Sequence, residues 1–331
     1  MTISSINILE SNRNNLISII APFYNEGQGV KEFYRALVLE LELLSQYDFE
    51  VICIDDGSAD DTLIQLIALS QFDGRFRVIE LSRNFGKEAA LTAGLDLACG
   101  DAVIPFDADL QDPPSLIGRL INAWKKEGAD MVLAKRSDRN SDNFLKKSTA
   151  ALFYEIHNRV SDVKIPQNVG DCRLMNRLVI DSLKLLPERQ RFMKGLFAWV
   201  GFKTVVIEYA REKRSAGTTK FSGWRLWNFA IEGFTSFGSL PLKIWSYVGL
   251  LGALITFSYG CFILLRTLIY GVDVPGYASL LVSILFFGSL QLMGIGILGE
   301  YIGRIYIESK HRPNYLVRKV HQNGSLKNIR E

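Results

Sequence analysis

Cysteine and histidine are scarce in this 331-residue chain, which contains four cysteines and three histidines. The cysteines are far apart and form no CxxC pair; they are Cys53, Cys99, Cys172 and Cys261. An ordinary zinc site needs clustered Cys or His ligands, and a disulfide framework needs regularly spaced cysteines. The sequence therefore excludes the first and gives no sign of the second.

A strong excess of charge is also missing. The 38 basic and 35 acidic residues leave a net charge of +3, without a dense block of Lys and Arg. Nucleic-acid binding relies on such blocks, so we expect no nucleic-acid partner. No P-loop occurs, and Glu32 stands where a dinucleotide fingerprint starting at Gly27 needs its third glycine. These absences argue against an NTPase and a dehydrogenase.

Apolar residues are plentiful, at 48% of the chain, and the mean hydropathy is +0.12. Two runs, 244–265 and 276–299, contain no Asp, Glu, Lys or Arg over 22 and 24 residues. Helices of that length can cross a hydrocarbon core of about 30 Å. Two buried core helices are the alternative, although such helices seldom reach this length without a charged edge. We expect a transmembrane hairpin over residues 244–302.

Basic residues flank the two runs unequally. Arg225 and Lys243 precede the first run and five Lys or Arg residues between 304 and 319 follow the second, whereas Arg266 is alone in the connection. Positive charge collects on the cytoplasmic side of a membrane, so we expect both termini there. Residues 1–15 contain no apolar segment typical of a signal peptide.

The segment before the first run has aromatic residues at helical spacing. Trp224 and Trp227 lie on one face of the predicted helix, and Arg225 lies on another. Tryptophan near a basic residue is typical of a helix lying at the membrane surface. An amphipathic helix packed on the preceding domain would give the same pattern.

Residues 16–210 alternate short apolar runs with helical patterns. The apolar runs cover residues 16–22, 50–54, 78–81 and 102–106, and the helical patterns cover 30–44, 61–70 and 88–98. Such alternation predicts an α/β fold, with a mostly parallel sheet covered by helices on both faces. Ligands of these sheets bind beyond the carboxyl ends of the strands.

Polar clusters follow three of the apolar runs at this edge. They read PFYNE at residues 22–26, DDGS at 55–58 and DADLQ at 107–111. Asp107 and Asp109 are two apart, so on an extended chain their carboxylates point to the same side and repel each other unless a cation lies between them. Mg²⁺ or Mn²⁺ suits such oxygen ligands. A solvated acidic turn is the alternative.

These motifs together resemble a known enzyme family. PFYNE, DDGS, SRNFGKEAAL at 82–91 and DADLQDP at 107–113 resemble the family 2 glycosyltransferases with a GT-A head, in particular the dolichol-phosphate mannose synthase-like group. AKRSDR, NVGDCRLMNR, ERQRFMKG and LGEYIGRIYIE resemble one branch, the bacterial polyprenyl-phosphate glycosyltransferases with two C-terminal spans, above all the bactoprenol glucosyltransferases. The likeness covers about residues 16–320. The departures are the residues before Leu16 and Cys172, where we expect a larger apolar residue.

The resemblance implies an arrangement of five segments in the bacterial inner membrane, with the catalytic domain and both termini cytoplasmic. An N-terminal extension (1–15) precedes the α/β GT-A domain (16–214). An acceptor loop and interfacial helix (215–243), the hairpin (244–302) and a cytoplasmic tail (303–331) follow. The tail alternates apolar and basic residues over 315–320, which predicts a strand that pairs with a neighbouring protomer. The resemblance also implies a homo-oligomer, for which we name a tetramer.

The resemblance further assigns roles to individual residues. The donor would contact Pro22, Tyr24, Glu26, Asp55, Asp56, Lys87 and Asp107. The metal, Mg²⁺ or Mn²⁺, would be held by Asp107, Asp109 and Gln111. The acceptor phosphate would meet Arg136, Arg139, Arg214 and Lys220, because two anionic groups must be held close together. Asp171 would orient the acceptor or accept a residual proton.

Each assignment has a structural alternative. Tyr24 can pack against the core, Glu26 can cap a helix and Lys87 can be a solvated surface charge. The basic residues can meet anionic lipid headgroups instead of substrate. Asp171 can form a structural ion pair with Arg173 or Arg177.

The expected reaction is transfer of a sugar, glucose by overall similarity, from a UDP-sugar to polyprenyl (undecaprenyl) phosphate with inversion at the anomeric carbon. The lipid product would modify a glycan or lipopolysaccharide, after a flippase and a downstream glycosyltransferase have taken it over. Amino-arabinose or mannose as the donor sugar stays open. A non-enzymatic membrane assembly subunit, from a different functional class, also stays open.

Overall fold

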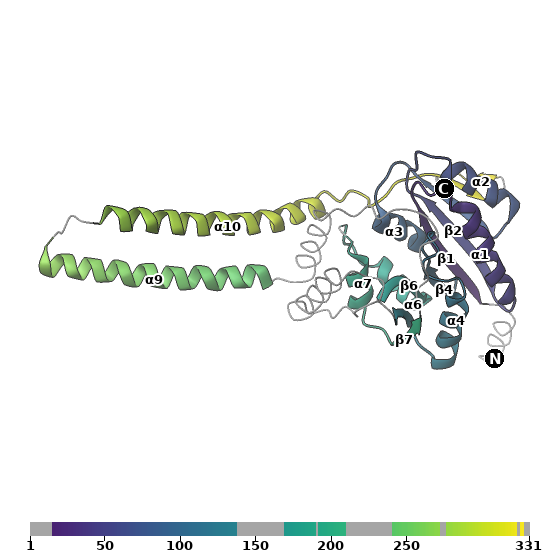
Figure 1. The fold of residues 1–331 in the computed structure, drawn as a ribbon, viewed down its shortest axis with the longest axis horizontal. Coiled ribbons are helices and arrows are strands. Elements are labelled where there is room, and N and C mark those ends of the chain that lie inside the picture. The colour runs from purple at the N-terminus through teal and green to yellow at the C-terminus, as the bar shows by residue number, and fades with distance from the viewer. Residues whose placement is uncertain are drawn as a thin grey trace, which may run out of the picture.

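The computed structural model describes residues 15–137, 169–189, 191–209, 240–271, 276–322 and 325–327. Within these residues, a mixed α/β head carries two long helices that extend away from one side of it (Figure 1). The expected N-terminal extension, apart from its last residue, and the expected interfacial helix both lie outside the described residues.

The head and the long helices contain the following elements. The strands are β1 (Leu16–Phe23), β2 (Asp48–Asp55), β3 (Phe76–Leu81), β4 (Ala102–Pro105), β5 (Met131–Arg136), β6 (Val169–Asn176), β7 (Thr204–Tyr209), β8 (Val317–Gln322) and β9 (Ser325–Lys327). The helices are α1 (Val30–Leu43), α2 (Thr62–Phe72), α3 (Lys87–Leu97), α4 (Leu116–Glu127), α6 (Arg177–Lys184), α7 (Met193–Trp199), α9 (Leu240–Tyr270) and α10 (Tyr277–Ser309).

Among the described residues the strands form one sheet in the order β7-β5-β6-β4-β1-β2-β3-β8-β9. The central strands β4, β1, β2 and β3 are parallel to one another, whereas β6 and β8 join the sheet antiparallel. This confirms the expected mostly parallel α/β sheet. The chain crosses from β3 back to β4, so the strand order reverses beside β1. Ligands of open α/β sheets bind at such a reversal.

Apolar layers cover both faces of the sheet. Ile19 and Phe23 of β1 face α1, where Phe33 and Leu37 are buried against them. Ile20 of β1 faces the other side and packs in the cluster that includes α3 and α7. Fully burying one such side chain contributes about 1.5–3 kcal/mol relative to exposure. The alternation of side chains along β1 therefore fixes which face each helix covers.

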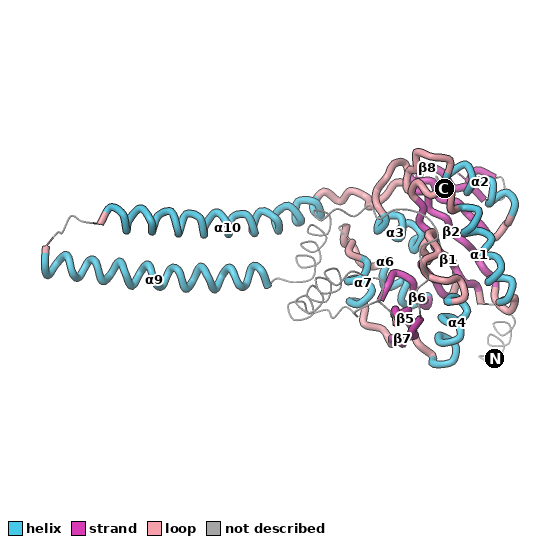
Figure 2. The backbone as a smooth tube through the Cα atoms, viewed as in Figure 1, coloured by secondary structure: helices cyan, strands magenta, loops and turns pink. Residues whose placement is uncertain are grey.

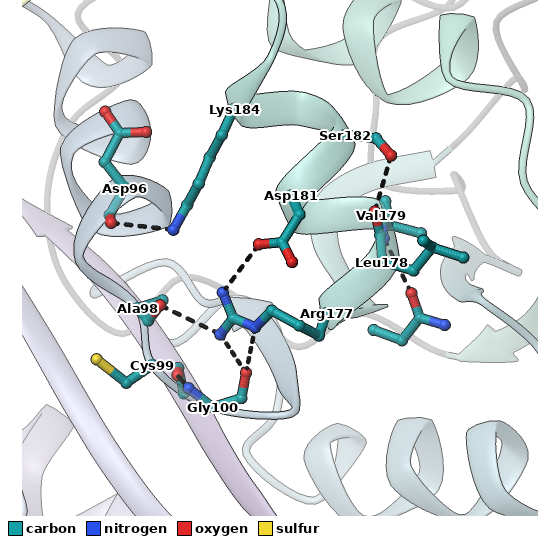
Figure 3. Close-up of polar contacts among 12 residues, drawn as sticks. Asp96, Ala98, Cys99, Gly100, Arg177, Leu178, Val179, Asp181, Ser182 and Lys184 are labelled. Atoms are coloured by element: carbon teal, nitrogen blue, oxygen red, sulfur yellow. Dashed lines mark hydrogen bonds and ion pairs between the residues drawn. The ribbon is translucent and has the colours of Figure 1, made fainter.

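The corner between β6 and α6 is fastened to the end of α3 (Figure 3). The Arg177 guanidinium donates hydrogen bonds to the carbonyl oxygens of Ala98, at 3.1 Å, and Gly100, at 3.0 Å from Nε. Lys184 Nζ donates to the Asp96 carbonyl oxygen at 3.0 Å. The bonds to Asp96 and Ala98 satisfy carbonyls that the end of α3 leaves without helical partners, and the bond to Gly100 fixes the loop that follows. They also hold β6, which carries Asp171, in place relative to α3.

The helices α9 and α10 follow the two apolar runs but extend beyond both, with 31 and 33 residues. They run antiparallel and side by side (Figures 1 and 2), and Trp245 of α9 packs over Gly294 of α10. Judged only on the described residues, neither these nor any other helix is long and apolar enough to cross a membrane. The helical hairpin is thus observed, and its membrane-spanning character stays a prediction.

The C-terminal tail forms a strand, as its alternation predicts. The partner of this strand differs from the expectation, because β8 pairs antiparallel with β3 of the same chain. Without β8, the outer edge of β3 would present unpaired N–H and C=O groups. Val320 of β8 is buried in the cluster with Ile79 and Leu81, so burial and backbone pairing both favour the contact within the chain.

Candidate active site

The loop that follows β1 is joined to the loop that follows β2. The Asn25 side-chain oxygen accepts a hydrogen bond from the Ala59 N–H at 2.8 Å, and the Glu26 N–H donates to Thr62 Oγ1 at 2.9 Å. Asn25 has a φ of 53°, a left-handed conformation that asparagine tolerates better than most residues. Tyr24 is 45% exposed. Tyr24 is therefore not core packing.

Asp55 and Asp56 are both buried but differ in their partners. Asp55 Oδ2 accepts from the Ser58 N–H at 3.3 Å, while its Oδ1 is buried without a hydrogen-bond partner among the described residues. Asp56 accepts from the N–H groups of Phe85 at 2.7 Å and Gly86 at 2.9 Å. Burial raises the pKa of both carboxyls. Asp55 thus retains an oxygen for a ligand, whereas Asp56 holds the turn that carries Lys87.

Lys87 joins two carboxylates from distant parts of the chain. Its Nζ lies 2.8 Å from Asp107 Oδ1 and 2.7 Å from Asp171 Oδ2. Burial alone would lower the pKa of Lys87, but Asp107 and Asp171 raise it above its usual range. Although its side chain is 45% exposed, Lys87 is therefore a charge paired with two carboxylates of the site and not an isolated surface lysine.

The pKa values of the two carboxyls shift in opposite directions, although Lys87 lowers both. Burial alone would raise the pKa of Asp171, but Lys87 and Lys194 hold it below its usual range. Burial raises the pKa of Asp107 despite its contact with Lys87. Asp171 is consequently ionised at neutral pH and a weak proton acceptor.

Asp107 to Gln111 form a turn after β4, which ends at Pro105. The expectation that Asp107 and Asp109 lie on an extended chain is therefore wrong. Leu110 adopts a φ of 54° in this turn, and Asp109 Oδ1 accepts from the Gln111 N–H at 3.2 Å. The tight turn, and not the two-residue strand period, brings Asp107, Asp109 and Gln111 close together.

The chemistry of this turn fits a hard divalent cation. Asp107, Asp109 and Gln111 offer two carboxylates and an amide oxygen, and Mg²⁺ or Mn²⁺ commonly completes such a shell with water and phosphate oxygens. Among the described residues, no three or more His, Cys, Asp or Glu side chains lie close enough together to hold a metal ion.

Arg136 lies beside the strand that carries Asp171. Its Nε donates to Tyr209 Oη at 3.2 Å, its Nη2 lies 3.9 Å from Asp112 Oδ1, and the Tyr209 hydroxyl donates to Asp112. Burial alone would lower the pKa of Arg136, but the bond to Tyr209 raises it. A Cβ added at Gly170 would lie 3.2 Å from Arg136 Nη2. The structure thus places Arg136 in the site, while Arg139, Arg214 and Lys220 lie outside the described residues.

The alternative ion pairs of Asp171 do not form. Arg173 donates to the backbone oxygens of Gly170 at 2.9 Å and Asp171 at 3.3 Å, and its guanidinium stacks on the Phe197 ring at 4.0 Å. Arg177 pairs with Asp181 at 3.6 Å. Asp171 keeps its carboxylate for Lys87.

Two charged residues of the site escape prediction from the sequence. Glu88 follows Lys87 at the start of α3, and its Oε2 is buried without a partner among the described residues. Burial and the charge of Asp171 raise the pKa of Glu88 to about 7. Lys194 of α7 acts on the charges of both Asp171 and Glu88. Glu88 lies in the NFGKE turn and Lys194 in the ERQRFMKG segment, two motifs that the sequence analysis singles out. The two residues come together only through the packing of α7 on α3.

The chain is similar to known glycosyltransferases. A model of glycosyl transferase family 2 matches residues 18–184. A bactoprenol glucosyl transferase of Shigella phage SfV is 54% identical over 306 residues, 92% of this chain and 99% of that protein. An uncharacterized glycosyltransferase of Synechocystis sp. is 50% identical over 301 residues, 91% of this chain and 94% of that protein.

Among solved structures, mannosyltransferase PcManGT from Pyrobaculum calidifontis, in complex with GDP-Man and Mn²⁺, superimposes with a TM-score of 0.46. It is 14% identical, and the match covers 89% of this chain and 88% of that one. The family model spans more than half of this chain, and the phage relative matches nearly its whole length. The chain therefore belongs to glycosyl transferase family 2.

Proposed function

We propose that this protein transfers a sugar, glucose in the first place, from a UDP-sugar to polyprenyl (undecaprenyl) phosphate. The observation that carries the proposal is the meeting of Asp107, Lys87 and Asp171 at the carboxyl edge of the sheet. At this edge, a family 2 glycosyltransferase needs charged groups that hold the donor diphosphate and the acceptor close together. The name of the phage relative, bactoprenol glucosyl transferase, supports the choice of sugar and lipid.

The donor side is formed by the loops after β1 and β2. Pro22, Tyr24, Glu26 and Asp55 contact the nucleotide, and the buried Asp55 Oδ1 without a partner accepts an N–H from its base. Asp56 acts indirectly, because it accepts hydrogen bonds from the turn that positions Lys87.

The diphosphate lies over the turn after β4. Asp107, Asp109 and Gln111 would hold Mg²⁺ or Mn²⁺ there. The ion, when bound, supplies positive charge that stabilises the negative charge developing on the departing diphosphate. Lys87 adds a fixed positive charge beside Asp107.

The acceptor is a phosphate monoester with a second pKa of about 6, so it is largely ionised at pH 7 and needs no strong base. Asp171, whose pKa is held low, orients Lys87 and the acceptor in place of taking a proton. Arg136, with Arg139, Arg214 and Lys220, receives the acceptor phosphate through charge-assisted hydrogen bonds.

The reaction is a single displacement. A phosphate oxygen of the lipid forms a bond to the anomeric carbon as the bond from that carbon to the diphosphate oxygen breaks, and the electron pair leaves with UDP. An α-linked UDP-glucose therefore gives a β-linked lipid phosphate sugar.

The helical hairpin serves to bring the head to its lipid. Moving a polyprenyl tail into water costs about 0.8 kcal/mol for each CH₂ exposed, so the enzyme has to work at the membrane. Large apolar side chains of α9 and α10 are exposed, among them Leu250, Leu254 and Ile284. We place both helices in the bacterial inner membrane, with the head and both termini cytoplasmic and the chains associated as a homo-oligomer such as a tetramer.

The test is a donor panel with the full chain in lipid nanodiscs containing undecaprenyl phosphate. Mass spectrometry reports whether UDP-glucose, another UDP-sugar, an amino-arabinose donor or a mannose donor is used, and NMR reports the anomeric configuration. Asp107→Ala with Asp109→Ala should lower turnover by at least about 100-fold, and EDTA should stop it until Mg²⁺ or Mn²⁺ is restored. Asp48→Ala, at the exposed opposite end of β2, is the control.

The outcomes separate the alternatives. Transfer of a sugar other than glucose changes the donor but keeps the chemistry. Nucleotide binding without turnover with any donor supports a non-enzymatic assembly subunit. Normal turnover of the double variant, or a product of retained configuration, contradicts the proposal.

A further inference from the structure

The C-terminal strand β8 brings basic side chains to β3, next to the strand whose carboxyl end carries Asp55. Glu80 of β3 is 6% exposed, and it meets two of these side chains. Its Oε1 lies 3.1 Å from Arg318 Nη1, and its Oε2 lies 3.2 Å from His321 Nε2. The Glu80 side chain is 8% exposed and that of His321 is 14% exposed, whereas that of Arg318 is 65% exposed. The contact with His321 is therefore the better shielded of the two.

Glu80 is also the neighbour of Asp55. The two residues are partners in the parallel register of β2 and β3, so their side chains leave the sheet on the same face. Burial raises the pKa of Asp55, and the hydrogen bonds from Ser58 lower it. The charge of Glu80 raises it as well. The charge on Glu80 therefore bears on the carboxyl whose Oδ1 has no hydrogen-bond partner among the described residues.

The path of the tail fixes this arrangement. Seven residues join the end of α10 at Ser309 to the start of β8 at Val317, and they cross the head past α3 (Figure 1). Tyr315 Oη donates to Asp96 Oδ2 at 2.8 Å, and the Ser82 N–H donates to the Leu316 carbonyl oxygen at 2.9 Å. The tail reaches β3 along a route held at several points.

We propose that β8 is a part of the donor site, in which His321 and Arg318 are positioning residues that act through Glu80 on Asp55. By holding the Glu80 carboxylate on β8, through a hydrogen bond from His321 and the charge of Arg318, they leave the Asp55 carboxylate to accept the imide N–H of uracil. The inference rests on the proposed function, since it takes Asp55 as the contact for the donor base. It adds a role for a segment that follows the hairpin and lies far from the donor loops in sequence.

The test compares donor and acceptor kinetics in the full chain. His321→Leu should raise the KM for the UDP-sugar and the Kd for UDP about three- to tenfold, which corresponds to the coupling of neighbouring charged groups. The KM for the lipid should stay unchanged. Arg318→Ala should show a smaller effect in the same direction. Arg35→Ala, which removes an exposed cation from α1 on a different part of the head, is the control.

A double-mutant cycle separates this role from simple support of the fold. With Glu80→Gln the charge behind Asp55 is absent, so His321→Leu should then change UDP binding little. His321→Gln, which keeps an N–H donor, should bind UDP nearly as the wild type does. Thermal unfolding with and without UDP shows whether each variant is folded.

Several results would overturn the inference. They are unchanged UDP binding in both His321→Leu and Arg318→Ala, equal losses for donor and lipid, or additive effects of Glu80→Gln and His321→Leu. Failure of the wild-type chain to bind UDP would overturn the proposed function itself. Wild-type binding with unaffected variants would overturn only the role of β8.

Discussion

Carboxyl groups at the edge of the sheet respond differently to burial, depending on the nearest cation. Asp171 contacts Lys87 at 2.7 Å, and its pKa is held below the usual range. Burial and the charge of Asp171 raise the pKa of Glu88 to about 7. The charges of Lys87 and Lys194 and a hydrogen bond from the Met193 N–H lower it by less. Neighbouring acids in one site thus have opposite charge preferences, set by their contacts.

This difference predicts a pH-dependent gain in stability for Glu88→Gln. The folded chain binds the Glu88 proton up to about pH 7, whereas the unfolded chain releases it near the ordinary value of 4.5. Ionisation of Glu88 therefore lowers the free energy of unfolding progressively as the pH rises between these values. Glu88→Gln should raise Tm at pH 8 and leave it nearly unchanged at pH 4.5.

The measurement is thermal unfolding of both proteins at the two pH values. Glu32→Gln, an exposed position in the first turn of α1, serves as the control. An equal change in Tm at pH 4.5 and pH 8 would show that Glu88 is not buried in its protonated form.

The sequence predicts some site residues well and others not at all, for a physical reason. Asp55, Lys87 and Asp107 follow apolar runs or a glycine turn, so strand periodicity places them at the carboxyl edge. The contact between Lys87 and Asp171 spans 84 positions, and that between Thr92 and Met193 spans 101. Such contacts arise from packing, and therefore the roles of Glu88 and Lys194 were missed.

At the scale of elements, the loops after β2 and β3 approach each other closely. Gly57 has a φ of 68°, and a Cβ added there would lie 2.5 Å from the Arg83 carbonyl carbon and 2.6 Å from the Asn84 nitrogen. Asp56 beside it bonds the next two N–H groups of that turn. The position of Lys87 therefore depends on the absence of a side chain at residue 57.

This close approach predicts that Gly57→Ala damages both stability and activity. The added methyl meets backbone on the facing loop and adopts a left-handed φ, so we expect a loss of more than about 2 kcal/mol of unfolding free energy. UDP binding should weaken as well. Gly128→Ala is the control, since its φ of 54° is also left-handed but no atom lies within 4 Å of the added Cβ.

Chemical denaturation and UDP titration measure the two effects. A cost for Gly57→Ala equal to that for Gly128→Ala would mean that φ strain alone matters. The two loops would then not depend on close contact.

The elements themselves follow the sequence closely, while their pairing does not. The apolar runs at 16–22 and 50–54 correspond to β1 and β2, and the pattern at 88–98 corresponds to α3. Periodicity reports the local backbone, so it predicts these elements. The partner of β8 depends on which strand edge is open, and the turn at Asp107 depends on the φ of Leu110. Neither leaves a periodic signal.

At the scale of the whole molecule, the four cysteines sample different environments. Cys53 and Cys172 are buried in the head, Cys99 is exposed on the head, and Cys261 is exposed on α9. The proposed membrane position of the hairpin would cover Cys261 with lipid and leave Cys99 in the cytoplasm.

The natural cysteines therefore test the proposed topology. A membrane-impermeant maleimide should label Cys99 in inside-out vesicles and not in intact spheroplasts. Cys261 should react only after detergent is added, because a maleimide needs a thiolate in water. Peptide mass mapping, with Cys99→Ser and Cys261→Ser as controls, assigns each label. Ready labelling of Cys261 in intact vesicles would contradict a lipid-covered α9.

The position of β8 after the hairpin has a consequence for how the chain matures. The ribosome synthesises β8 after α9 and α10, so the head gains this strand only once both long helices have been made. A protein cut short before α9 would leave β3 as an open edge, which invites pairing with other chains. Replacing α9 and α10 with a flexible linker would retain β8. The resulting head should aggregate less than a chain truncated before α9.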